Sequence, residues 1–109
     1  MDNKIKISIA SDFSITPASR YKDEGPFSGE EFREDFLEPK FQEAIKENKK
    51  LEIILDGTIG YATSFLEEVF GGLARKHGVD LVLSTIELVS SEEEYLKDDI
   101  LDYIKKAND

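Results

Sequence analysis

The stretch "DGTIGYATSFLEEVFGGLARKHG", residues 56–78, carries the pattern that decides the fold of this chain. It begins at the end of a short apolar run, passes through a turn made of glycine and hydroxyl residues, and continues with apolar residues at helical spacing. Those apolar residues are Phe65, Leu66, Val69, Phe70, Leu73 and Ala74. Their i, i+3, i+4, i+7 spacing predicts an amphipathic helix, and Gly78 stands where a glycine often ends one. The stretch therefore predicts a strand, a turn and a helix in succession.

Three segments have the composition of strands. In "KIKISIA", residues 4–10, isoleucines alternate with polar residues, which predicts a strand with one buried face. The run "LEIILD", residues 51–56, is almost continuously apolar, which is typical of a central parallel strand covered on both faces. The segment "VDLVLSTIELVS", residues 79–90, is predicted to be the third strand.

The segment "SGEEFREDFLEPKFQEAIKENKK", residues 28–50, is predicted to be helical. Ser28 and Glu31 have the spacing of a capping box at its start. Pro39 is expected to end or kink this helix, or to begin a second one.

The remaining segments are a loop and a final helix. The loop covers residues 11–27, and within it Phe13 and Ile15 could extend a short additional strand. The segment "SSEEEYLKDDILDYIKKAND" is predicted to be a helix that Ser90 or Ser91 caps.

The order of these elements predicts one α/β domain over residues 1–109. Strands that alternate with helices indicate a mainly parallel, or mixed, short sheet with right-handed crossovers. We expect three to four helices packed largely on one face of that sheet.

Composition limits the classes of function. The formal net charge is −10, from 24 acidic and 14 basic residues, which disfavours direct binding to nucleic acid or to an anionic membrane. No apolar run reaches the roughly 18 residues of a membrane span, no signal-peptide pattern is present, and the chain has no cysteine. We therefore expect a cytoplasmic protein. The acidic clusters at residues 23–38 and 90–99 are either solvated faces or surfaces that attract a basic partner.

Residue patterns for catalysis are weak. His77, the one histidine, lies at the predicted end of a helix, where it suits the helix dipole. The adjacent carboxylates have no metal-loop spacing, and the glycine turn lacks the lysine of a phosphate-binding loop. We expect no enzyme activity, no cofactor and no metal. Gly71 and Gly72 disfavour a helix, so either the helix breaks there or another backbone packs closely against it. We expect close packing against the sheet or a partner protein.

The hydroxyl residues Thr63 and Ser64 stand at the predicted start of the helix that follows the turn. Ser64 and Glu67 again have the spacing of a capping box, which would explain the serine structurally. A phosphate on such a serine would also bring charge to the helix start, at the end of a sheet where partners dock. Both interpretations stay open.

The segments "SGEEFREDFLEP" and "LEIILDGTIGYATSFLEEVFGGLAR" resemble the STAS-like family of unknown function, which is related to anti-sigma factor antagonists. The resemblance extends from about Arg20 to the third predicted strand. It implies a small α/β domain with a regulatory or adaptor role. It also places Ser64 at the position that a kinase-type anti-sigma factor phosphorylates in STAS domains, with Thr63 before it. Ala62 stands in place of an acidic residue there, and Phe65 in place of a glycine.

Together these observations predict a non-enzymatic regulatory module that binds another protein, with a switch at Ser64 or Thr63. The predicted contact residues are Asp56, Gly57, Thr58, Gly60, Tyr61, Phe65, Glu67 and Glu68. The expected partner is a histidine-kinase-like ATPase or another regulator, and the few strands would also allow a homodimer. The alternative is an acidic inhibitor or decoy that blocks a basic partner surface.

Overall fold

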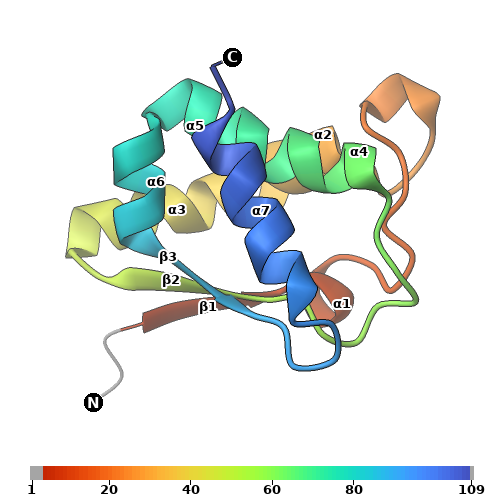
Figure 1. Ribbon diagram of the computed structural model, residues 1–109, viewed down its shortest axis with the longest axis horizontal. Coiled ribbons are helices and arrows are strands. Elements are labelled where there is room, and N and C mark those ends of the chain that lie inside the picture. The colour runs from red at the N-terminus through yellow and green to blue at the C-terminus, as the bar shows by residue number, and fades with distance from the viewer. Residues whose placement is uncertain (1–3, 109) are drawn as a thin grey trace.

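The computed structural model describes residues 4–108 and is built on a three-stranded parallel sheet. Its strands are β1 (Lys4–Ser8), β2 (Lys50–Ile54) and β3 (Ile86–Val89), with β2 between the other two. Figure 1 shows the long helices above one face of this sheet. The predicted α/β fold, with parallel strands and helices largely on one face, is confirmed.

Two long helical runs each contain one π-helical turn. The first run consists of α2 (Gly29–Phe32), η2 (Arg33–Leu37) and α3 (Glu38–Glu47). The second consists of α4 (Thr63–Leu66), η3 (Glu67–Gly71) and α5 (Gly72–His77). The other segments are α1 (Ile9–Asp12), the 3-10 turn η1 (Lys22–Glu24), α6 (Val79–Thr85) and α7 (Tyr95–Lys105). Wider π turns inside α-helices are often found near functional positions.

The first helical run begins where the sequence predicts. The Ser28 hydroxyl accepts a hydrogen bond from the Glu31 N–H at 3.0 Å, so this cap is confirmed. Pro39 does not end the helical run: it is the second residue of α3, whose first residue, Glu38, directly follows the π turn η2, so a helical element begins close to Pro39 as one of the expectations had it. A proline ring collides with the carbonyl four residues earlier in a regular helix, and the wider π turn stands at that place.

The predicted third strand is largely wrong. Of residues 79–90, the first seven form α6, and only Ile86–Val89 form β3. Gly78, at φ 98°, ends α5 as predicted and lets the chain turn into α6. Val82 is buried and Val79 is half-buried, so the apolar side chains follow a helical spacing that a short apolar run does not distinguish from a strand.

Two smaller predictions are also corrected. Phe13 and Ile15 form no strand, because α1 follows β1 directly and the chain after it is irregular up to η1. The last helix begins at Tyr95, so neither Ser90 nor Ser91 caps it. The Ser90 hydroxyl instead donates a hydrogen bond to the Glu93 carbonyl at 2.7 Å.

The sheet has one buried face and one charged face. Its buried face contributes to the core with Ile5, Ile7, Leu51, Ile53 and Ile86. On the other face, Lys4 Nζ lies 2.9 Å from a Glu87 carboxylate oxygen and 3.5 Å from one of Glu52. The prediction that β2 is covered on both faces is therefore wrong. Within residues 4–108, no helix is long and apolar enough to cross a membrane.

Candidate functional site

The predicted docking turn, residues 56–64, lies at the edge of the sheet where the parallel strands end. The Leu55 N–H donates to the Val89 carbonyl at 2.8 Å, which ties the start of the turn to the segment after β3. Ala10 lies just after β1, and a Cβ on Gly57 would lie 3.0 Å from its side chain. The turn therefore lies between the other two strand ends, which is the place where parallel sheets commonly bind ligands.

Asp56 and Gly57 fasten the turn to the loop before α7. The Asp56 carboxylate accepts hydrogen bonds from the backbone N–H of Ser91 at 3.1 Å and of Glu92 at 2.9 Å. In return, the Gly57 N–H donates to the Glu92 carboxylate at 2.8 Å. Gly57 has φ 98°, a conformation that favours glycine. The two segments thus hold each other through reciprocal hydrogen bonds.

Hydrogen bonds from the backbone N–H groups of Glu92 and Ser91 hold the pKa of Asp56 below its ordinary value. The carboxylate therefore stabilises the fold at pH values above the ordinary aspartate pKa, and this contribution is lost as the pH falls through the lowered folded-state pKa. We expect Asp56→Asn to reduce the free energy of unfolding by about 1 kcal/mol at pH 7, a small value because the group is near solvent. Urea unfolding at pH 7 and at pH 2.5 to 3 checks this, with the difference between the two proteins shrinking at the acid end. A difference that does not change with pH would contradict the assigned role of the ionised carboxylate.

Two further contacts fix the middle of the turn. The Tyr61 hydroxyl donates to the Leu55 carbonyl at 2.6 Å, and burial raises the pKa of Tyr61 to about 12. The Ile59 N–H donates to the Ile15 carbonyl at 2.8 Å. The Ile59 side chain is nevertheless 79% exposed. The turn is thus anchored at several points while it presents an apolar side chain to solvent.

Ser64 is not the helix cap that the sequence predicts. The helix begins at Thr63, and the residue before it, Ala62, occupies the cap position with φ −75° and ψ 141°. Ser64 is consequently inside the first turn of the helix, where its hydroxyl no longer meets the Glu67 N–H. Among the described residues, the hydroxyls of Thr63 and Ser64 have no hydrogen-bond partner. Thr63 is exposed and Ser64 is half-buried.

Two of the predicted contact residues point into the protein. Phe65 is fully buried and packs with Phe32 and Tyr61 at ring centroid distances of 6.2 and 6.0 Å. Glu68 is only 6% exposed. The other predicted residues are exposed or half-buried: Asp56, Gly57, Thr58, Gly60, Tyr61, Thr63 and Ser64 in the turn, and Glu67 after it.

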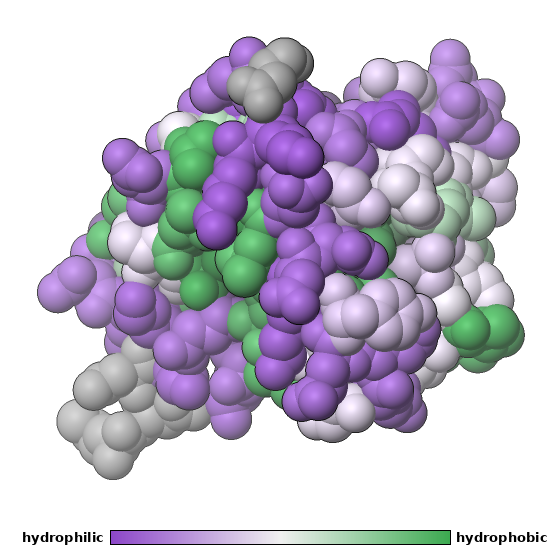
Figure 2. All heavy atoms as spheres, in the orientation of Figure 1, coloured by the Kyte–Doolittle hydropathy of each residue, from purple (hydrophilic) through white to green (hydrophobic). Residues whose placement is uncertain are grey.

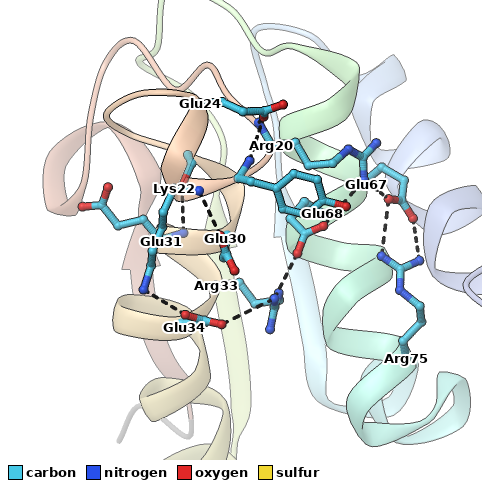
Figure 3. A network of polar contacts seen from close by, with 12 residues as sticks. Arg20, Lys22, Glu24, Glu30, Glu31, Arg33, Glu34, Glu67, Glu68 and Arg75 are labelled. Carbon is cyan, nitrogen blue, oxygen red and sulfur yellow. Dashed lines mark hydrogen bonds and ion pairs between the residues drawn. The ribbon is translucent and has the colours of Figure 1, made fainter.

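Beside the turn lies a network of ion pairs that the sequence did not predict (Figure 3). Arg20 Nη1 lies 2.5 Å from one Glu67 carboxylate oxygen, and Arg75 Nη1 lies 2.7 Å from the other. Arg33 Nη2 lies 2.9 Å from Glu68, and Arg20 Nη1 is 3.6 Å from the same carboxylate. Hydrogen bonds from Arg75 and Arg20, set against partial burial, hold the pKa of Glu67 below its ordinary value. The network joins the loop before α2 to both helical runs.

The two adjacent glycines make room for this network. A Cβ on Gly72 would lie 2.7 Å from Arg33 Nε and 2.9 Å from its Cδ, and one on Gly71 would collide with the Glu67 carboxylate. The expectation of packing against the sheet or a partner protein is therefore wrong, because side chains of the network occupy the space. A signal in the sequence was the i, i+4 spacing from Glu67 to Gly71 and from Glu68 to Gly72.

The remaining titratable groups of the described residues include one histidine, which has structural partners. The His77 ring hydrogen-bonds to Glu38 through Nε2 and packs on Phe41 at a centroid distance of 4.8 Å. In the described part of the chain, no group of three or more His, Cys, Asp or Glu residues is arranged to hold a metal ion.

Comparison with protein families gives one match. A family model described as a STAS-like domain of unknown function (DUF4325) matches residues 28–96. Neither curated proteins nor solved structures gave a match. The matched range contains both helical runs, β2, the turn and β3, and it leaves out β1 and Arg20. Because the match covers more than half of the residues, the chain belongs to the family of STAS-like domains of unknown function.

Proposed function

We propose that this protein is a non-enzymatic regulatory module that binds another protein through the turn at residues 56–64. The observation that carries the proposal is Ile59, which is 79% exposed at the tip of a turn that hydrogen bonds fix to the segments beside it. A large apolar side chain on a preformed surface is typical of the anchor residues of protein interfaces. A turn that is already ordered also loses little conformational entropy on binding.

Ser64 is the proposed switch of this surface, with Thr63 as the neighbouring candidate. Ser64 is half-buried at the start of the helix that leaves the turn, and its hydroxyl has no hydrogen-bond partner in residues 4–108. A phosphate there adds close to two negative charges, one helical turn before Glu67. The changed charge would weaken the complex with one partner. The proposed partner is a histidine-kinase-like ATPase or another regulator.

The docking role is tested by comparing two isoleucine variants. Proteins retained by the immobilised full chain are quantified for the wild type, Ile59→Glu and Ile45→Glu. Ile45 is 41% exposed and lies near Lys50, at the opposite end of β2 from the turn, so it is a matched control. We expect the amount of at least one retained protein to fall about tenfold on Ile59→Glu, as for an anchor residue. The amount of the same protein retained by Ile45→Glu should equal that retained by the wild type. Equal retention by both variants would contradict the docking role.

The switch is tested with the retained partner in purified form. We expect Ser64→Asp to weaken binding by about tenfold, while Ser64→Ala binds as the wild type does, because the unmodified serine is the binding form. The affinity of Thr63→Asp, measured in the same way, shows whether a negative charge at Thr63 has the effect that is expected at Ser64. Circular dichroism of each variant verifies the fold. If Ser64→Asp and Ser64→Ala both bind with wild-type affinity, Ser64 is not a switch.

A further inference from the structure

The apolar tip of the docking turn has a second residue that comes from the loop after α1. The hydrogen bond from the Ile59 N–H to the Ile15 carbonyl, at 2.8 Å, places the two backbones side by side. Ile59 and Ile15 are 79% and 52% exposed. In Figure 1 the loops that carry them run together at the right of the molecule, and Figure 2 shows a hydrophobic projection at that margin. Two neighbouring exposed isoleucines make an apolar surface that neither loop offers alone.

The segments that surround these isoleucines carry uncompensated negative charge. Residues 9–18, 55–64 and 90–95, which follow the three strands, contain no lysine or arginine. Their carboxylates are Asp12, Asp56, Glu92, Glu93 and Glu94. Within residues 4–108, none of these five forms an ion pair, although the charge of Lys97 acts on Asp56. Hydrogen bonds to backbone N–H groups hold three of them in place, namely Asp12, Asp56 and Glu92.

The other acidic region of the chain differs in this respect. Glu34 lies 2.9 Å from Lys22, and Glu38 lies 3.3 Å from Lys76 and hydrogen-bonds to His77. Cations of the same chain thus lie near three of the seven carboxylates of residues 23–38, namely Glu34, Asp35 and Glu38. Among the described residues, the five carboxylates at the ends of the strands form no ion pair at all. The apolar pair therefore lies among carboxylates that no ion pair neutralises.

We infer that Ile15 and Ile59 together form the anchor for a partner protein whose apolar pocket is bordered by lysine or arginine. This inference rests on the proposed docking function, and it adds the loop after α1, the acidic border and the chemistry of the partner. Apolar anchors supply most of the affinity of an interface, and complementary charge at its border supplies specificity and rapid association. The loop at residues 11–27 thereby contributes one half of the contact surface.

The same charges disfavour two other occupants of this surface. A second copy of the chain would bring two sets of these carboxylates together, and like charges across an interface destabilise it. Nucleic acid would bring its phosphates to the same carboxylates. A basic protein surface has neither problem.

Selection of random linear peptides displayed on phage tests the inference without a known partner. The full-length protein is the bait, and the double variant Ile15→Ser/Ile59→Ser is used for counter-selection. We expect enriched peptides to combine a large apolar residue with flanking lysine or arginine. They should bind the wild type about tenfold more tightly than either single serine variant. Their affinity should fall by about tenfold between low and high salt.

Charge is tested separately from apolar contact. We expect Glu93→Gln/Glu94→Gln to weaken the selected peptides severalfold, and the charge-matched control Glu43→Gln/Glu47→Gln on α3 to leave them unchanged. Three results would each overturn the inference. The selected peptides could lack basic residues, they could bind Ile15→Ser as tightly as the wild type, or they could show no enrichment over the double variant. The proposed function fails independently, if the protein partner is retained equally by Ile59→Glu and Ile45→Glu.

Discussion

Replacing Gly29 with alanine is expected to lower the free energy of unfolding by about 2 kcal/mol. Gly29 is buried in the first turn of α2, and an alanine Cβ there would lie 2.8 Å from the Phe65 carbonyl oxygen and 3.0 Å from Glu68 Cβ. The first of these atoms belongs to the backbone of α4, so it cannot move aside as the end of a long side chain does. The better helix propensity of alanine stabilises the folded state by at most about 1 kcal/mol, which is less than the destabilisation from overpacking.

Gly60→Ala is the matched control for this substitution. Gly60 lies in the exposed turn, and a Cβ there would meet no atom within 4 Å. We expect a change of less than about 0.5 kcal/mol, measured for both variants by urea unfolding followed by circular dichroism. A Gly29→Ala protein as stable as the wild type would show that α2 and α4 do not depend on this close approach.

Local patterns predicted most of the fold. Alternation in residues 4–10 identifies β1, since side-chain burial in a strand repeats every two residues. The continuous apolar run at residues 51–56 identifies β2. Residues 79–90 were predicted wrongly because a short apolar run fits a buried strand and a helix equally well. The helix there follows from tertiary packing against α5 and α7, which the local pattern does not contain.

The capping-box spacing occurs at both Ser28 and Ser64, and only the first forms a cap. Ser28 itself has an extended backbone, φ −75° and ψ 160°, so its hydroxyl meets the N–H three residues later. Before the second helical run, Ala62 takes that extended conformation instead. The spacing of side chains therefore predicted the region of a helix start, while backbone conformation decided which residue caps it.

The candidate site was predictable only where its parts are close in sequence. Asp56 and Gly57 stand out because they follow a buried strand directly. Arg20 and Arg33 contact glutamates that are 47 and 35 residues away, so no local pattern identifies the pairs. Ile15 became part of the proposed anchor through its backbone contact with Ile59, which also joins distant segments.

Arg33→Met is expected to have the largest effect, a loss of about 3 kcal/mol in the free energy of unfolding. The side chains of Arg33 and Glu68 are only 15% and 8% exposed, and their charged groups lie 2.9 Å apart. Without Arg33, the Glu68 carboxylate stays buried, with Arg20 at 3.6 Å as its remaining cation. A buried charge that loses its partner destabilises a protein more than the loss of an exposed pair does.

Two further variants separate the effect of burial from the effect of the ion pair. Lys22 and Glu34 also lie 2.9 Å apart, but their side chains are 45% and 44% exposed, so Lys22→Met should leave the free energy of unfolding nearly unchanged. Adding Glu68→Gln to Arg33→Met removes the stranded charge, and the double variant should lose about 2 kcal/mol less than the sum of the single variants. Additive losses would mean that the two side chains stabilise the fold independently. Coupled losses would support the role of this pair in holding η2 and η3, and with them the two helical runs, together beside the docking turn.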